Sequence, residues 1–112
     1  GIYLTKFLTA NVINNKVDKT GSFGIWAVGD FTSAPSNTDN SRLLIDDNTI
    51  SNNRQNAIRV NNVKDITITN NTGDKTRYVG MVVSGFDTAS IVDNDITNTG
   101  RSGVDIRNGK TS

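Results

Sequence analysis

Short stretches in which apolar and polar residues alternate recur along the whole chain. A tetrapeptide of the form small, aliphatic, variable, apolar occurs as GIYL at 1, GIWA at 24, AIRV at 57, GMVV at 80 and GVDI at 103. Successive starts lie 23, 33, 23 and 23 positions apart. Alternation with period two predicts a short strand at each occurrence, with its apolar residues turned toward a shared interior. A repeat of this length without a helical pattern is typical of a solenoid.

An asparagine provides a second marker in each repeat. It lies fourteen residues after the start in three repeats, at Asn15, Asn71 and Asn94, and the matching residue of the second repeat is Asn48. Asn48 comes ten residues late because a segment rich in Gly, Ser, Pro and Asn is inserted near 29–42, where it predicts a loop. Two further strands are expected in each repeat, one before this asparagine and one after it. The sequence therefore predicts an all-β parallel solenoid over residues 1–112, with three short strands in each coil of about 23 residues and four to five coils.

The repeated asparagines have a structural explanation. Asn tolerates the left-handed backbone conformation, and its amide can hydrogen-bond the same amide one coil away. We expect Asn15, Asn48, Asn71 and Asn94 to form such a ladder where the chain turns between the second and third strands. These residues are interpreted as scaffold and not as part of an active site.

The combination of GIxV with I-x-x-N-x-I resembles the right-handed parallel β-helix of the pectate-lyase-like superfamily, over essentially the whole chain. The resemblance implies a right-handed coil and a complex extracellular carbohydrate as the usual ligand. The superfamily includes polysaccharide lyases, polygalacturonase-like hydrolases, alginate epimerases and trimeric phage tailspikes, so the predicted location is extracellular or in a virion tail. The fold does not choose among these functions. A structural or adhesive spacer without activity is the alternative.

The outward positions of the first strands carry the candidate binding residues. These positions hold Tyr3, Trp26, Arg59, Asp105 and Arg107. Sugar rings stack on exposed aromatic side chains, while guanidinium groups orient carboxylates and hydroxyls. We therefore predict a polysaccharide partner, with Tyr3, Trp26, Arg59 and Arg107 as substrate-binding residues. In the alternative interpretation, Tyr3 and Trp26 pack under the inserted loop, and the two interpretations are compatible.

Catalytic candidates are limited to carboxylates and arginines, because the chain has no His and no Cys. Hydrolysis of a glycosidic bond needs two carboxyl groups about 5 to 9.5 Å apart. A lyase or epimerase instead needs a base and a cation beside the uronate carboxylate, and Asp105 with Arg59 fits this loosely. Their separation of two coils, roughly 10 Å, is long for cooperation on one sugar. The NTD at 37–39 is similar to a polygalacturonase motif but lies in the inserted loop, so we interpret it as coincidence.

The composition bears on nucleic acids, membranes, cofactors and metals as partners. Twelve Lys and Arg against eleven Asp give a net charge of +1, so no nucleic-acid partner is expected. No apolar run approaches the roughly 18 residues of a membrane span, and neither a cofactor nor a metal motif is present.

The second-strand face shows three outward aliphatic residues, and in tailspike-like proteins such a face meets the other subunits of a trimer, so a homotrimer is one predicted assembly. Because the chain begins without Met and carries no capping element, we expect it to be part of a longer protein.

Overall fold

The computed structural model describes residues 1–32, 34 and 38–107, which form strands and no helix. Sheet A has the order β1 (Ile2–Thr5), β4 (Ile25–Val28), β7 (Ile58–Asn61), β10 (Met81–Ser84) and β13 (Val104–Arg107). Sheet B contains β2 (Thr9–Ile13), β5 (Arg42–Asp46), β8 (Asp65–Thr69) and β11 (Thr88–Val92). Sheet C contains β3 (Lys16–Asp18), β6 (Thr49–Asn53), β9 (Thr72–Thr76) and β12 (Asp95–Thr99).

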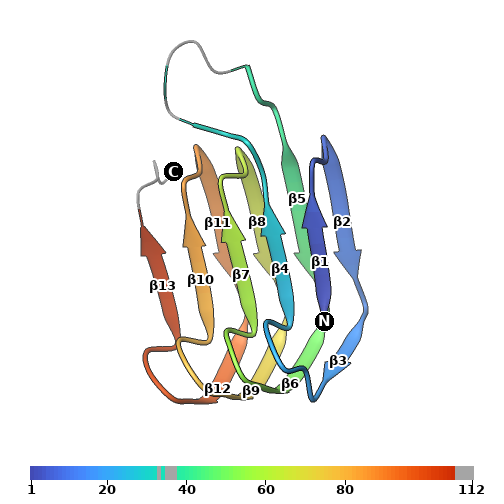
Figure 1. The fold of residues 1–112 in the computed structure, drawn as a ribbon, viewed down its shortest axis with the longest axis vertical. Coiled ribbons are helices and arrows are strands. Elements are labelled where there is room, and N and C mark those ends of the chain that lie inside the picture. Colours follow the sequence, from blue (N-terminus) through green and yellow to red (C-terminus); the bar gives the residue numbers. More distant parts are fainter. Residues whose placement is uncertain (33, 35–37, 108–112) are drawn as a thin grey trace.

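Each coil contributes one strand to each sheet, and neighbouring coils pair in parallel throughout. Figure 1 shows sheets A and B facing each other, with sheet C closing the lower end of the coil. In sheet A the register places Ile2, Ile25, Ile58, Met81 and Val104 in one column. The predicted fold class, a parallel solenoid with three strands in each coil, is confirmed, and the spacing of paired residues matches a repeat of about 23 residues.

The core consists of the inward positions of all three sheets. Ile25, Ile45, Ile58 and Ile68 have no exposed surface, and each stacks on an apolar residue of the next coil. β-branched side chains suit this environment because they pack well on a pleated surface. The interior of the sheets is mainly apolar, with the polar Asn53 and Thr76 buried in sheet C. The outward positions and the turns are therefore the surfaces that a ligand can reach.

The turns depend on residues in the left-handed backbone conformation. After sheet B every coil has such a residue, with φ between 56° and 58°, at Asn14, Asp47, Asn70 and Asp93. A second column lies at the C-terminal ends of the sheet C strands, at Lys19, Asn52, Lys75 and Asn98. The expectation that the ladder asparagines themselves adopt this conformation is wrong, because the left-handed residue is the one immediately before each of them. The asparagine after it can then turn its amide toward the core.

The ladder itself consists of buried side-chain hydrogen bonds between coils. Nδ2 of Asn71 donates to Oδ1 of Asn94 at 2.9 Å and to the carbonyl oxygen of Ile45 at 2.9 Å. Oδ1 of Asn71 accepts from both the backbone N and the Nδ2 of Asn48, each at 2.9 Å. Asn48 makes the same pair of bonds to Asn15, with Oδ1 of Asn48 accepting from the backbone N and Nδ2 of Asn15. Asn48 and Asn71 are 1% exposed, so the ladder satisfies polar groups that water cannot reach.

Carboxylates on the outside of sheet C also connect successive coils. Oδ1 of Asp18 accepts from Ser51 Oγ and Asn52 Nδ2, both at 2.8 Å. Asp74 accepts from Asn98 Nδ2 at 2.7 Å and from Thr97 Oγ1 at 3.2 Å. These hydrogen bonds, led in each case by the asparagine amide, lower the pKa of both carboxyl groups below the ordinary value of 3.8.

The lowered pKa values of Asp18 and Asp74 predict a loss of stability in acid. Their contribution is fully present above pH 3.8 and is lost as the pH falls through the lower pKa of the folded state. Thermal unfolding followed by circular dichroism from neutral pH to below pH 3.8 should show this loss, and the double substitution Asp18→Asn with Asp74→Asn should make the profile shallower. If Asp95→Asn flattens the profile equally, the hydrogen bonds from the next coil are not the cause.

The inserted segment leaves the solenoid after β4 and rejoins it at β5. In Figure 1 its described parts extend beyond the upper ends of these strands. It leaves along sheet A, because Gly29 N donates to Asn61 O and Phe31 N donates to Asn62 O, both at 2.9 Å.

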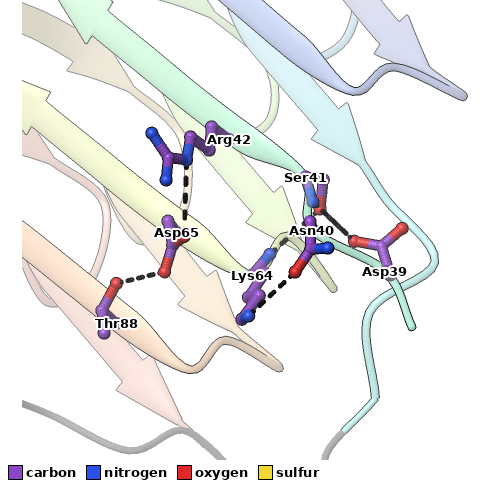
Figure 2. A network of polar contacts seen from close by, with 7 residues as sticks. All are labelled: Asp39, Asn40, Ser41, Arg42, Lys64, Asp65 and Thr88. Carbon is purple, nitrogen blue, oxygen red and sulfur yellow. Dashed lines mark hydrogen bonds and ion pairs between the residues drawn. The ribbon is translucent and has the colours of Figure 1, made fainter. Parts of the chain in front are cut away.

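The return of the segment is held by the polar network of Figure 2. Asp39 accepts from the backbone N and Oγ of Ser41, and Lys64 Nζ donates to Asn40 Oδ1 at 3.0 Å. The network continues into sheet B through the ion pair of Arg42 with Asp65 and the hydrogen bond from Thr88 to Asp65. Both ends of the insertion are therefore tied to the next coil.

Candidate functional site

The outward face of sheet A gathers the residues that the sequence pattern singles out. The register aligns Tyr3, Trp26, Arg59, Val82 and Asp105 in one column. The second outward column is Thr5, Val28, Asn61, Ser84 and Arg107. All the sequence-predicted binding and catalytic residues thus lie on one face, with Tyr3, Trp26, Arg59 and Asp105 in the first column and Arg107 in the second.

An aromatic platform formed by Tyr3, Phe23 and Trp26 occupies the N-terminal end of this face. The ring centroid of Trp26 lies 4.8 Å from that of Tyr3 and 4.7 Å from that of Phe23, in tilted arrangements. Tyr3 is 58% exposed, while Trp26 and Phe23 are half-buried. Sequence reasoning missed Phe23 because it lies in the turn before β4, where no alternation indicates the direction of a side chain.

Hydrogen bonds hold the polar part of the face next to the platform. The Arg59 guanidinium lies 5.7 Å from the centroid of the Phe23 ring, and its Nε donates to Asn61 Oδ1 at 3.1 Å. The same oxygen accepts from Trp26 Nε1 at 3.4 Å, and Asn61 Nδ2 donates to Ser84 Oγ at 2.7 Å. Asn61 therefore couples Trp26 to Arg59, and both side chains are positioned before any ligand arrives.

Next to Arg59 the surface is hollowed. This arginine hollow has a volume of about 230 Å³ and is lined by residues that include Arg59, Tyr78, Val82, Arg101, Asp105 and Arg107. Tyr78 and Arg101 come from the turns between sheets C and A, and the Arg101 guanidinium lies 5.6 Å from the centroid of the Tyr78 ring. These two residues were missed by the sequence reasoning. They occupy equivalent positions of successive repeats, and this equivalence is the signal that could have found them.

Charge is unevenly distributed in the arginine hollow. Arg107 donates two hydrogen bonds to Asp105, from Nε at 2.9 Å and from Nη2, which lowers the pKa of Asp105 and raises that of Arg107. In the part of the chain that the structure describes, the ion pairs are Arg107 with Asp105 and Arg42 with Asp65. Asp105, the carboxylate among the described lining residues, is paired with Arg107, so Arg59 and Arg101 contribute positive charge to the hollow.

The same geometry bears on the catalytic hypothesis for Asp105 and Arg59. Both side chains line the hollow, but Val82 lies between them in the column and Asp105 is paired with Arg107. Asp105 is the only carboxylate among the described lining residues, so the hollow by itself lacks the two carboxyl groups of a glycosidase. In the NTD segment, Asp39 bonds to Ser41 and is not among the described lining residues of the hollow, and Asn37 lies outside the described residues. The catalytic role of Asp105 and Arg59 stays a prediction.

A comparison with protein-family models matches residues 32–112 to the family described as the right-handed beta helix region. The chain belongs to this family. The match agrees with the parallel solenoid and is consistent with the pectate-lyase-like superfamily. Searches of curated proteins and of solved structures give no match. The family identifies the architecture of this β-helix but does not specify its ligand.

The described residues of the β-helix have two further features. They contain no group of three or more Asp, Glu, His or Cys side chains that could hold a metal ion. In the same residues there is no helix of the length and hydropathy that would cross a membrane.

The outward face of sheet B is smoother. Ile13 and Val92 are 47% and 50% exposed, and a hollow of about 420 Å³ lies over Asn11, Leu44 and Thr67, beside the ion pair of Arg42 with Asp65. Scattered aliphatic side chains of this kind are also ordinary on protein surfaces. The homotrimer stays a prediction.

Proposed function

We propose that this β-helix binds a polysaccharide along the outward face of sheet A, in an extracellular setting or as part of a virion tail. The observation that carries the proposal is the exposed aromatic platform in line with the arginine hollow. An aromatic ring with the 58% exposure of Tyr3 offers a flat apolar surface to water, and the C–H faces of sugar rings cover such a surface well. Arg59 and Asn61 supply fixed donors and acceptors directly beside it.

The shape of this face favours a chain over a single sugar. Successive coils are about 4.8 Å apart, so the line from Tyr3 to Asp105 spans roughly 19 Å along the solenoid axis. The side chains of one column lie at this regular spacing, aromatic at one end and charged at the other. A linear polymer lying parallel to the axis contacts both ends, whereas a monosaccharide reaches one of them.

The test is binding of polysaccharides by the wild type, Tyr3→Ala and Trp26→Ala. Affinity electrophoresis against bacterial capsular, wall and uronate polymers identifies a ligand, and calorimetry with that ligand gives Kd. We expect each substitution to weaken binding by about tenfold, because each removes a stacking surface worth on the order of 1 kcal/mol beyond its buried area.

The matched control is Ile13→Ala, which removes an exposed apolar side chain from sheet B and should leave Kd unchanged. Far-ultraviolet circular dichroism checks that Trp26→Ala keeps the fold. Unchanged binding by both platform variants would contradict the proposal. Failure of the wild type to bind any of these polymers would favour the structural spacer.

Depolymerisation is a further part of this proposal, supported by the position of Asp105 and Arg59 in the hollow. The same polymers are incubated with the protein while chain length and unsaturated-uronate absorbance are followed. Shortened chains with that absorbance indicate a lyase, and shortened chains without it a hydrolase. Asp105→Asn should abolish either activity, and uncut polymer with the wild type would leave a binding module.

A further inference from the structure

The arginine hollow is built differently from the platform and has a separate task. We propose that it binds the anionic substituent of an acidic sugar, a carboxylate or a sulfate ester, in the polysaccharide that the platform stacks. This inference rests on the proposed function and names its substrate class.

The charge balance of the hollow is the first argument. Among the described residues, three guanidinium groups and one carboxylate line it, and Arg107 is engaged with that carboxylate. Arg59 and Arg101 remain as two like charges around one small hollow, on a chain whose net charge is only +1. Like charges held close together repel each other, and an anion between them removes this cost.

The second argument is that both guanidinium groups are held in place by aromatic rings. Arg59 lies over the Phe23 ring and Arg101 over the Tyr78 ring. A guanidinium that stacks on an aromatic ring keeps the N–H groups at its edge available for a carboxylate or sulfate. The hydrogen bond of Arg59 to Asn61 uses Nε, so its two Nη groups are left for a ligand. Less conformational entropy is then lost on binding than with freely rotating arginines.

The surroundings distinguish an acidic sugar from other anions. Val82 gives the hollow an apolar part, and Tyr78 is 37% exposed, which offers the face of a sugar ring something to contact. The volume of about 230 Å³ lies below the range of roughly 300 to 1,000 Å³ typical for drug-sized ligands. It suits one ring or its substituent. The net charge of +1 does not favour nucleic acid as the source of the anion.

Substitution of Asp105 is expected to strengthen the binding of an acidic ligand, whereas substitution of the arginines weakens it. By pairing with Arg107 it removes one cation from the hollow and presents a negative charge to an incoming anion. Asp105→Asn should therefore release Arg107 and strengthen binding of an acidic ligand several-fold. A damaged fold can weaken binding but does not strengthen it. A variant that binds more tightly therefore shows that the hollow itself was changed.

The experiment uses pairs of polymers that differ only in charge. Polygalacturonate is compared with its fully methyl-esterified form, and dextran sulfate with dextran, by calorimetry at low and high salt. The wild type should bind the charged member of at least one pair about tenfold more tightly at low salt, with the preference reduced by salt. Whichever pair shows the preference identifies carboxylate or sulfate as the recognised group.

Substitutions of the two arginines test whether the hollow causes the preference for the charged polymer. Arg59→Gln and Arg101→Gln should each remove most of the preference for the charged polymer, about tenfold, since each deletes charge-assisted hydrogen bonds. Arg42→Gln, an exposed arginine on sheet B, is the matched control and should keep the preference. Tyr3→Ala should instead weaken charged and neutral members alike.

The outcomes separate the two proposals. If the wild type binds both members of a pair equally and Tyr3→Ala abolishes both, the polysaccharide function stands and the anion site is overturned. An unchanged preference in both Arg59→Gln and Arg101→Gln also overturns it. If neither charged member binds, the anion site is overturned, and the polysaccharide function is decided separately by the affinity screen with Tyr3→Ala and Trp26→Ala.

Discussion

The Asn71→Ala protein is expected to lose about 3 kcal/mol or more of its free energy of unfolding. Asn71 is 1% exposed and its amide bonds to Asn94 and to the carbonyl oxygens of Ile45 and Thr69. Alanine removes these hydrogen bonds, at about 1 kcal/mol each, and takes the acceptor Oδ1 of Asn71 away from the buried backbone N–H of Asn48, at about 1 to 3 kcal/mol for an unsatisfied group. Such a loss is a large share of the total stability of a folded domain, which is only about 5–15 kcal/mol.

Urea unfolding followed by circular dichroism measures this loss. Asn11→Ala is the matched control, because Asn11 is an exposed asparagine on the outward face of β2 and its replacement should change stability by no more than about 0.5 kcal/mol. Asn15 lies at one end of the ladder, so the loss of stability in Asn15→Ala should lie between the losses in Asn71→Ala and Asn11→Ala. Equal midpoints for Asn71→Ala and Asn11→Ala would show that the ladder is not a source of stability.

The second large effect is expected in the core. Ile58→Ala should destabilise the protein by about 2 to 5 kcal/mol, because it removes a fully buried side chain that stacks between Ile25 and Met81. The backbone on both sides is held by parallel pairing with β4 and β10, so the neighbouring coils cannot move inward to fill the cavity. The size of the loss therefore reports how rigidly the coils are stacked.

Two related variants calibrate the core prediction. Ile58→Val removes a single methylene and should cost about 1 kcal/mol. Ile13→Ala changes the same residue type at a position that is 47% exposed and should cost much less than Ile58→Ala. A loss below about 1 kcal/mol for Ile58→Ala would indicate that the coils repack around the cavity.

The construction of the candidate site follows from the repeat. Equivalent turn positions one coil apart hold Gln55, Tyr78 and Arg101, and these three residues line one side of the arginine hollow. The strands provide a rigid base, and substitutions at a single position of successive coils change the character of the surface step by step. A polymer-binding face can thus vary in chemistry without any change in the core that supports it.

The amino-acid sequence was sufficient to predict the solenoid, the outward columns of its sheets and the position of the asparagine ladder. The neighbours of a residue in a parallel solenoid lie one repeat away in either direction, so the repeat length defines the contacts and strand alternation defines the faces. For this reason Tyr3, Trp26, Arg59, Asp105 and Arg107 could be assigned to one face before their positions were known.

The parts that depend on turns and side-chain conformations became known from the three-dimensional arrangement. The sequence pattern did not indicate that Phe23 completes the platform or that Tyr78 and Arg101 line the hollow, because turn residues follow no alternation that encodes a direction. It also could not show that Asp105 bonds to Arg107 on its own strand, since rotamers choose among partners at similar distance. The left-handed residues lie one position before the ladder for a related reason: the turn is made by the backbone of one residue, and the amide that it aims inward belongs to the next.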